Sequence, residues 1–128
     1  MTLPHKRHNP GFLALVADAR TRVSEIDAPG LGKLIASGEP FLLVDVREES
    51  EWEAGHAAGA IHLSKGIIER DIETCIPSKD QRLILYCGGG YRSVLAADNL
   101  KKMGYTNAVS LAGGWRAYVS EGLPVEER

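Results

Sequence analysis

Hydrophobic residues recur along the chain in two patterns, which predict alternating strands and helices. Short continuous apolar runs are typical of strands buried on both faces of a parallel sheet, and they occupy residues 41–46, 59–63, 82–86 and 108–111. We expect a further short strand at residues 24–26. Helical patterns fill the intervening segments, at residues 27–37, 49–54, 67–75, 93–103 and 115–121. This alternation predicts an α/β domain with a mainly parallel central sheet.

A separate amphipathic helix precedes this alternation. Asn9-Pro10 has the character of a helix cap followed by proline at the first helical position. Apolar residues then recur at helical spacing on one stripe, made of Phe12, Leu15, Val16, Ala19 and Val23. We therefore expect an N-terminal extension at residues 1–23 with one helix, followed by the α/β domain at residues 24–128.

The composition fits one globular domain and excludes several classes of protein. The chain has 128 residues, 44% hydrophobic and 25% charged, and a net charge of -2, so we expect no nucleic-acid partner and no membrane partner. No apolar stretch approaches the roughly 20 residues of a membrane span. The two cysteines, Cys75 and Cys87, are too few for a disulfide framework or a four-ligand zinc site. We expect a cytoplasmic protein without a metal or cofactor.

The segment after the strand predicted at 82–86 carries the candidate chemistry. Cys87 stands at the carboxyl end of that strand, where open α/β sheets bind ligands. The glycines after it let N–H groups turn toward one point, and such a nest beside a helix start favours negative charge. An inert buried cysteine with a glycine turn is the alternative. The combination favours a thiolate nucleophile at Cys87, with substrate-binding residues Gly88, Gly89, Gly90, Tyr91, Arg92 and Ser93.

Three motifs, in order, resemble the rhodanese (thiosulfate sulfurtransferase-like) family in its single-domain form. The first is Val44-Asp45-Val46-Arg47-Glu48 with residues 51–63, the second is the Cys87 loop, and the third is Leu111-Ala112-Gly113-Gly114-Trp115-Arg116-Ala117-Tyr118 with residues 122–125. The resemblance covers about residues 24–126. It implies a three-layer rhodanese-like domain, with about five strands and helices on both faces of the sheet.

The resemblance also implies sulfur transfer through a Cys87 persulfide. Cys87 would attack the outer sulfur of a donor such as thiosulfate, and a thiol or cyanide acceptor would then take the sulfane sulfur. The implied partners are this small-molecule donor and acceptor, with a sulfur-relay protein as a further candidate. Gly88, Gly89 and Gly90 supply no cation, unlike the loop of many active members, so a persulfide donor stays open beside thiosulfate.

Two other functions stay open. One is a sulfur-carrier or regulatory binding module with little turnover on thiosulfate. The other is a cysteine phosphatase or arsenate reductase, enzymes of a related fold that place five residues between cysteine and arginine, after a histidine. Here four residues separate Cys87 from Arg92, and Tyr86 precedes the cysteine, which favours sulfur transfer.

Several residues beside the loop are candidates for supporting the site. We expect Asp45 and Arg47 to form an ion-pair network with Glu51 or Glu53, because paired charges near strand ends are usually structural. We expect His56 to satisfy backbone groups and Trp115 to pack in the core or at the pocket rim.

Two residues keep alternative roles at this point. Arg92 either holds an anionic donor or braces the loop against an acidic residue. Cys75 is predicted to be a thiol of the core or of a helix end, and the alternative is a resolving cysteine for Cys87.

Overall fold

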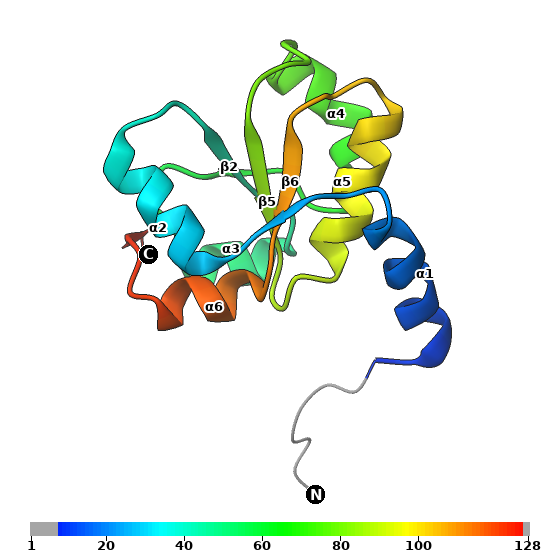
Figure 1. The fold of residues 1–128 in the computed structure, drawn as a ribbon, viewed down its shortest axis with the longest axis horizontal. Helices are drawn as coiled ribbons and strands as arrows, with labels where there is room; N and C mark the ends of the chain where they lie inside the picture. Colours follow the sequence, from blue (N-terminus) through cyan, green and yellow to red (C-terminus); the bar gives the residue numbers. More distant parts are fainter. Residues whose placement is uncertain (1–7, 127–128) are drawn as a thin grey trace, which may run out of the picture.

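The computed structural model describes residues 8–126 and shows a parallel sheet between two layers of helices (Figure 1). In spatial order the strands are β1 (Glu25–Ile26), β6 (Ala108–Leu111), β5 (Leu83–Tyr86), β2 (Leu42–Asp45) and β4 (Ile61–His62). The helices are α1 (Pro10–Arg20), α2 (Ala28–Ser37), α3 (Glu49–Ala54), α4 (Ile68–Cys75), α5 (Arg92–Lys102) and α6 (Gly114–Ser120). The predicted α/β class, with a parallel sheet of about five strands and helices on both faces, is confirmed.

A second, two-stranded sheet has no counterpart in the sequence pattern. β3 (His56–Ala57) pairs antiparallel with β7 (Val125–Glu126). Two residues are too few to show a period of two, so no pattern marks either strand. The strand expected at 59–63 is likewise shorter than predicted and is limited to β4.

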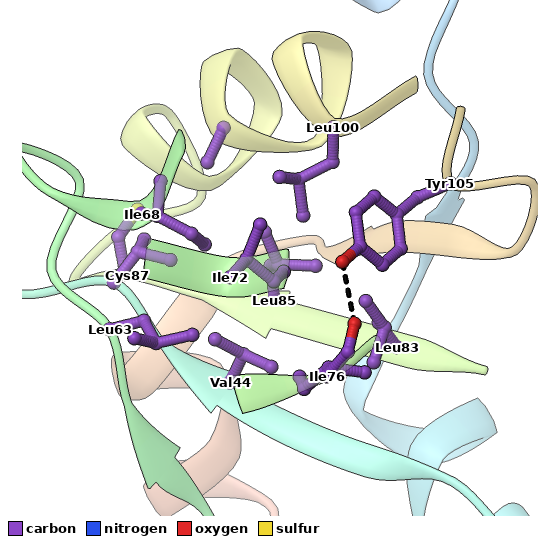
Figure 2. Close-up of a cluster of buried hydrophobic side chains, with 12 residues drawn as sticks. Val44, Leu63, Ile68, Ile72, Ile76, Leu83, Leu85, Cys87, Leu100 and Tyr105 are labelled. Carbon is purple, nitrogen blue, oxygen red and sulfur yellow. Dashed lines mark hydrogen bonds between the residues drawn. The ribbon is translucent and has the colours of Figure 1, made fainter. Parts of the chain in front are cut away.

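Alternation along β5 divides the core between the two faces of the sheet. Leu83 and Leu85 point to one face and pack with α4 and α5, and Cys87 continues this row. Ile84 and Tyr86 point to the other face, toward α2 and α6. Figure 2 shows Cys87 at the end of the first row, so its side chain lies on the face covered by α4 and α5.

Helix α1 lies outside both layers, beside α5 (Figure 1). Its Val16 and Ala19 are buried against Val94 of α5. Leu15, which helical spacing assigns to the buried stripe, is 57% exposed, because the contact with α5 is narrower than the stripe. Helix α1 forms within the predicted 1–23 extension, and the first seven residues of that extension lie outside the described part of the chain.

Residues 8–126 contain neither an obvious metal site nor a membrane-spanning helix. No group of three or more His, Cys, Asp or Glu side chains in this range is arranged to hold a metal ion. No helix in it has both the length and the apolar character needed to cross a bilayer.

The hydrogen bond from Tyr105 to the carbonyl of Ile76 provides a test of the packing on the α4 and α5 face (Figure 2). The hydroxyl donates at 2.6 Å, and Tyr105 is 1% exposed. We expect Tyr105→Phe to lower the free energy of unfolding by about 1–2 kcal/mol, because a buried carbonyl loses its donor. Urea denaturation measures this change. An unchanged free energy of unfolding would contradict it.

Candidate active site

The Cys87 thiol sits inside a turn of backbone that joins β5 to α5. The N–H of Gly90 donates to Sγ at 3.1 Å, and Ser93 Oγ lies 3.5 Å from Sγ. Gly90 has a φ of 94°, a left-handed conformation that favours glycine. Cys87 itself is only 1% exposed. The structure thus brings the predicted cysteine, glycine turn and helix start together around one sulfur atom.

Two opposing effects act on the pKa of Cys87. Burial alone would raise it, since a buried thiolate loses hydration. Hydrogen bonds from Ser93 and Gly90 and the charge of Arg92 act the other way and outweigh burial. The pKa of Cys87 is therefore held below its ordinary value, which favours the thiolate.

The shape of the loop depends on its contact with the start of α6. The N–H of Trp115 donates to the Cys87 carbonyl at 2.7 Å, and the N–H of Arg116 donates to the Gly88 carbonyl at 3.3 Å. A Cβ atom at Gly114 would lie 2.4 Å from the Cys87 carbonyl oxygen. Glycine at this position is therefore required for the two segments to approach this closely.

Ser110 is a buried neighbour of the site that sequence reasoning missed. Its hydroxyl lies 2.8 Å from Ser93 Oγ, and Ser93 in turn contacts Cys87. Both serines are fully buried. The available signal was a lone hydroxyl in the otherwise apolar strand β6, Ala108–Leu111.

Arg92 pairs with Glu51 of α3. Its two terminal nitrogens lie 3.2 and 3.4 Å from the two carboxylate oxygens. Burial would raise the pKa of Glu51, but hydrogen bonds from Arg92 and from the N–H of Glu48 hold it below its usual range. Glu51 is thus the partner of Arg92 and not of Arg47, and the bracing geometry foreseen for Arg92 is present.

A cavity of about 770 Å³ opens beside Cys87. Of the predicted binding residues, Gly88, Gly89, Tyr91 and Arg92 line it, whereas Gly90 and Ser93 contact the sulfur from within the loop. The rest of the lining comes from the N-terminal extension, α3 and its cap, and the start of α6: His8, Phe12, Glu48, Glu51, Gly113 and Arg116. Sequence reasoning did not assign His8, Phe12 or Arg116 to the site, because each is distant from Cys87 in sequence.

Asp45, Arg47 and Trp115 lie away from this cavity, on the opposite face of the sheet. Asp45 is paired in register with Tyr86 and shares its face. Arg47 binds Asp45 at 2.7 to 3.1 Å and the Gly55 carbonyl at 2.7 Å. Its guanidinium lies 4.6 Å from the centre of the Trp115 ring. The expected network with Glu51 or Glu53 is therefore wrong about the partner, because Arg47 pairs with Asp45 and Glu51 pairs with Arg92. Trp115 packs against the core rather than at the pocket rim.

His56 and Cys75 are also apart from the cavity. His56 stacks on Trp52 with ring centres 3.5 Å apart, and its Nδ1 lies 3.1 Å from the Trp52 carbonyl oxygen. Cys75 is an exposed free thiol at the end of α4, so it is at a helix end but not in the core. Its neighbour Ile76 lies at the far end of the cluster from Cys87 (Figure 2), and this arrangement does not bring the two cysteines together.

Comparison with known proteins gives this site a family context. The sequence profile described as Rhodanese-like domain matches residues 27–121. A sulfurtransferase of Allochromatium vinosum is 36% identical over 80% of this chain and 94% of its own length. A putative sulfurtransferase of Bacillus subtilis is 31% identical over 80% of this chain and 96% of its own.

A solved structure from Rhodopseudomonas palustris, of a protein of unknown function described as a possible tyrosine phosphatase, has a TM-score of 0.80 at 26% identity. The match covers 98% of this chain and 100% of that one. The sulfurtransferase names of the sequence relatives support sulfur transfer as the general activity. The profile match and these relatives show that the chain belongs to the rhodanese-like domain family.

Proposed function

We propose that the protein transfers a sulfane sulfur through a persulfide on Cys87. The thiolate attacks the outer sulfur of a donor such as thiosulfate, a new S–S bond forms, and sulfite leaves with the electron pair of the broken bond. A thiol or cyanide then attacks the terminal sulfur of the persulfide, and Cys87 returns as a thiolate. This is covalent catalysis in two half-reactions.

The observation that carries this proposal is the set of donors around Sγ. The Gly90 N–H and the Ser93 hydroxyl are placed to stabilise an anion on Cys87, and the pKa of the thiol is lowered accordingly. These donors stabilise the Cys87 thiolate at two points of the reaction, when it attacks the donor and when it leaves as the acceptor takes the terminal sulfur.

Two alternative functions, a phosphatase and a sulfur carrier, can be distinguished from this proposal by experiment. A phosphatase is suggested by the description of the R. palustris protein, but the four-residue interval from Cys87 to Arg92 makes a narrow loop. A sulfur carrier would use the same persulfide but hand it to a partner protein, with little turnover on thiosulfate.

Replacing the sulfur nucleophile tests the proposal. We expect Cys87→Ser to reduce cyanide-dependent thiocyanate release by at least about a thousandfold, because the serine hydroxyl is not ionised and forms no persulfide. Cys75→Ser is the matched control, and we expect it to retain activity. Activity that survives Cys87→Ser would contradict the proposal, as would hydrolysis of an aryl phosphate that depends on Cys87.

The hydroxyl of Ser93 provides a test of thiolate stabilisation that needs no substrate. In a Cys75→Ser background, we expect Ser93→Ala to raise the pKa of Cys87 by about one unit, since the charged form loses a donor. The midpoint of iodoacetamide alkylation against pH then moves upward. The exposed Ser78→Ala is the control. A midpoint that does not move, or that moves equally in the control, would contradict this role.

A further inference from the structure

Ser110 places a hydroxyl group inside the hydrophobic core. It lies in β6 between Val109 and Leu111 and is fully buried. In the sheet register it lies opposite Leu85 of β5, so its side chain points to the face that α4 and α5 cover. Burying a hydroxyl costs free energy unless the hydroxyl is hydrogen-bonded. The role of Ser110 therefore depends on its hydrogen-bond partner.

That partner is the serine that contacts the sulfur of Cys87. Ser110 Oγ lies 2.8 Å from Ser93 Oγ, and within residues 8–126 its hydroxyl makes no other hydrogen bond. Ser93 is in the first turn of α5, and its Oγ lies 3.5 Å from Cys87 Sγ. Both serines are fully buried and Cys87 is 1% exposed. The three side chains form a buried relay that runs from Ser110 through Ser93 to Cys87.

The direction of hydrogen bonding in this relay follows from the number of hydrogens. Each hydroxyl has one hydrogen to donate, whereas a thiolate has none and only accepts. When Cys87 is a thiolate, Ser93 donates to Sγ and Ser110 donates to Ser93 Oγ, so both hydrogens have acceptors. When Cys87 is a neutral thiol, three hydrogens share two contacts, and one of them has no acceptor within the relay. The relay therefore favours the thiolate over the thiol.

Ser110 adds to this relay what Ser93 alone would lack. A serine in a helix can also turn its hydroxyl toward a backbone carbonyl, and a donor on Ser93 Oγ favours the orientation toward Sγ. Hydrogen bonds in a buried chain also polarise and strengthen one another. The position of Ser110 is fixed by the sheet, because β6 pairs with both β1 and β5 and the Ser110 N–H donates to the Ser24 carbonyl at 3.0 Å.

We propose that Ser110 is a positioning residue for sulfur transfer: its buried hydroxyl donates to Ser93 Oγ and so directs the Ser93 hydrogen to the Cys87 thiolate. Ser110 lies outside the lining of the Cys87 cavity, so it acts through Ser93 and not on a substrate. The relay stabilises the thiolate when it attacks the donor and when it leaves. This inference rests on the proposed function and names a residue that supports its nucleophile.

The reactivity of Cys87 against pH tests this role without any substrate. In a Cys75→Ser background, we expect Ser110→Ala to lower the rate of iodoacetamide alkylation about threefold at pH values below the wild-type midpoint, because the thiolate loses support. At pH values above both midpoints the two rates converge, since the thiol is ionised in both proteins. A curve that does not move along the pH axis would overturn the inference.

Tyr105→Phe is the matched control for the loss of a buried hydroxyl. It removes a hydroxyl on the same face of the sheet, which donates to the Ile76 carbonyl far from Cys87 (Figure 2). We expect this variant to lose stability and to keep the alkylation curve of the Cys75→Ser protein. An equal shift in Tyr105→Phe and Ser110→Ala would show a general effect of core hydrogen bonds and would overturn the inference.

A double substitution shows whether the effect of Ser110 passes through Ser93. In a protein that already carries Ser93→Ala, we expect Ser110→Ala to cause no further movement of the alkylation curve, because the relay is already interrupted. The same movement with and without the Ser93 hydroxyl would overturn the relay.

Thiocyanate release separates this inference from the proposed function. We expect Ser110→Ala to lower kcat/KM for thiosulfate about threefold below the midpoint and to recover at higher pH. A Ser93-dependent shift of the alkylation curve in a protein that transfers no sulfur would support the relay and overturn the proposed function. Sulfur transfer by a protein whose alkylation curve does not respond to Ser110→Ala would overturn the relay and keep the proposed function.

Discussion

The close approach of the Cys87 loop to the first turn of α6 is the constraint on which the site depends. Trp115 and Arg116 donate backbone hydrogen bonds to the carbonyls of Cys87 and Gly88, and a side chain at Gly114 would collide with the Cys87 carbonyl. These two hydrogen bonds hold the Cys87 and Gly88 carbonyls toward α6 and so fix the course of the loop up to Gly90. The Gly90 N–H then meets Sγ, and the thiolate gains its donor from the fold itself.

The two faces of the sheet carry different parts of the site. Cys87 faces α4 and α5, where apolar packing fixes the sulfur. Arg47 and Asp45 face α2 and α6, where Arg47 binds the Asp45 carboxylate and the Gly55 carbonyl and lies against the Trp115 ring. A buried ion pair of this kind stabilises only when all its polar atoms are paired. The ion pair fixes the end of β2, the strand next to the loop. The charged residues that line the cavity are instead Glu48, Glu51, Arg92 and Arg116.

Whether the sequence predicts a contact depends on how far apart the two residues lie along the chain. The Cys87 turn lies within one short segment, so residue types and periodicity were enough to place the thiol at a strand end and helix start. The Arg92–Glu51 pair joins residues 41 positions apart, and Phe12 reaches the cavity only through the packing of α1 on α5. Such contacts depend on how elements pack, and no local pattern encodes them. Asp45 is intermediate, because strand alternation places it opposite Val44 and Val46, but only the register with β5 assigns it to the face opposite Cys87.

The most direct test of the account is to locate the transferred sulfur. The protein is incubated with thiosulfate or a small-molecule persulfide without an added acceptor, alkylated, digested and analysed by mass spectrometry. The account predicts one added sulfur atom on Cys87, lost on treatment with cyanide, and none on Cys75. A protein that stays unmodified with both donors, or that carries the sulfur on Cys75, would contradict it.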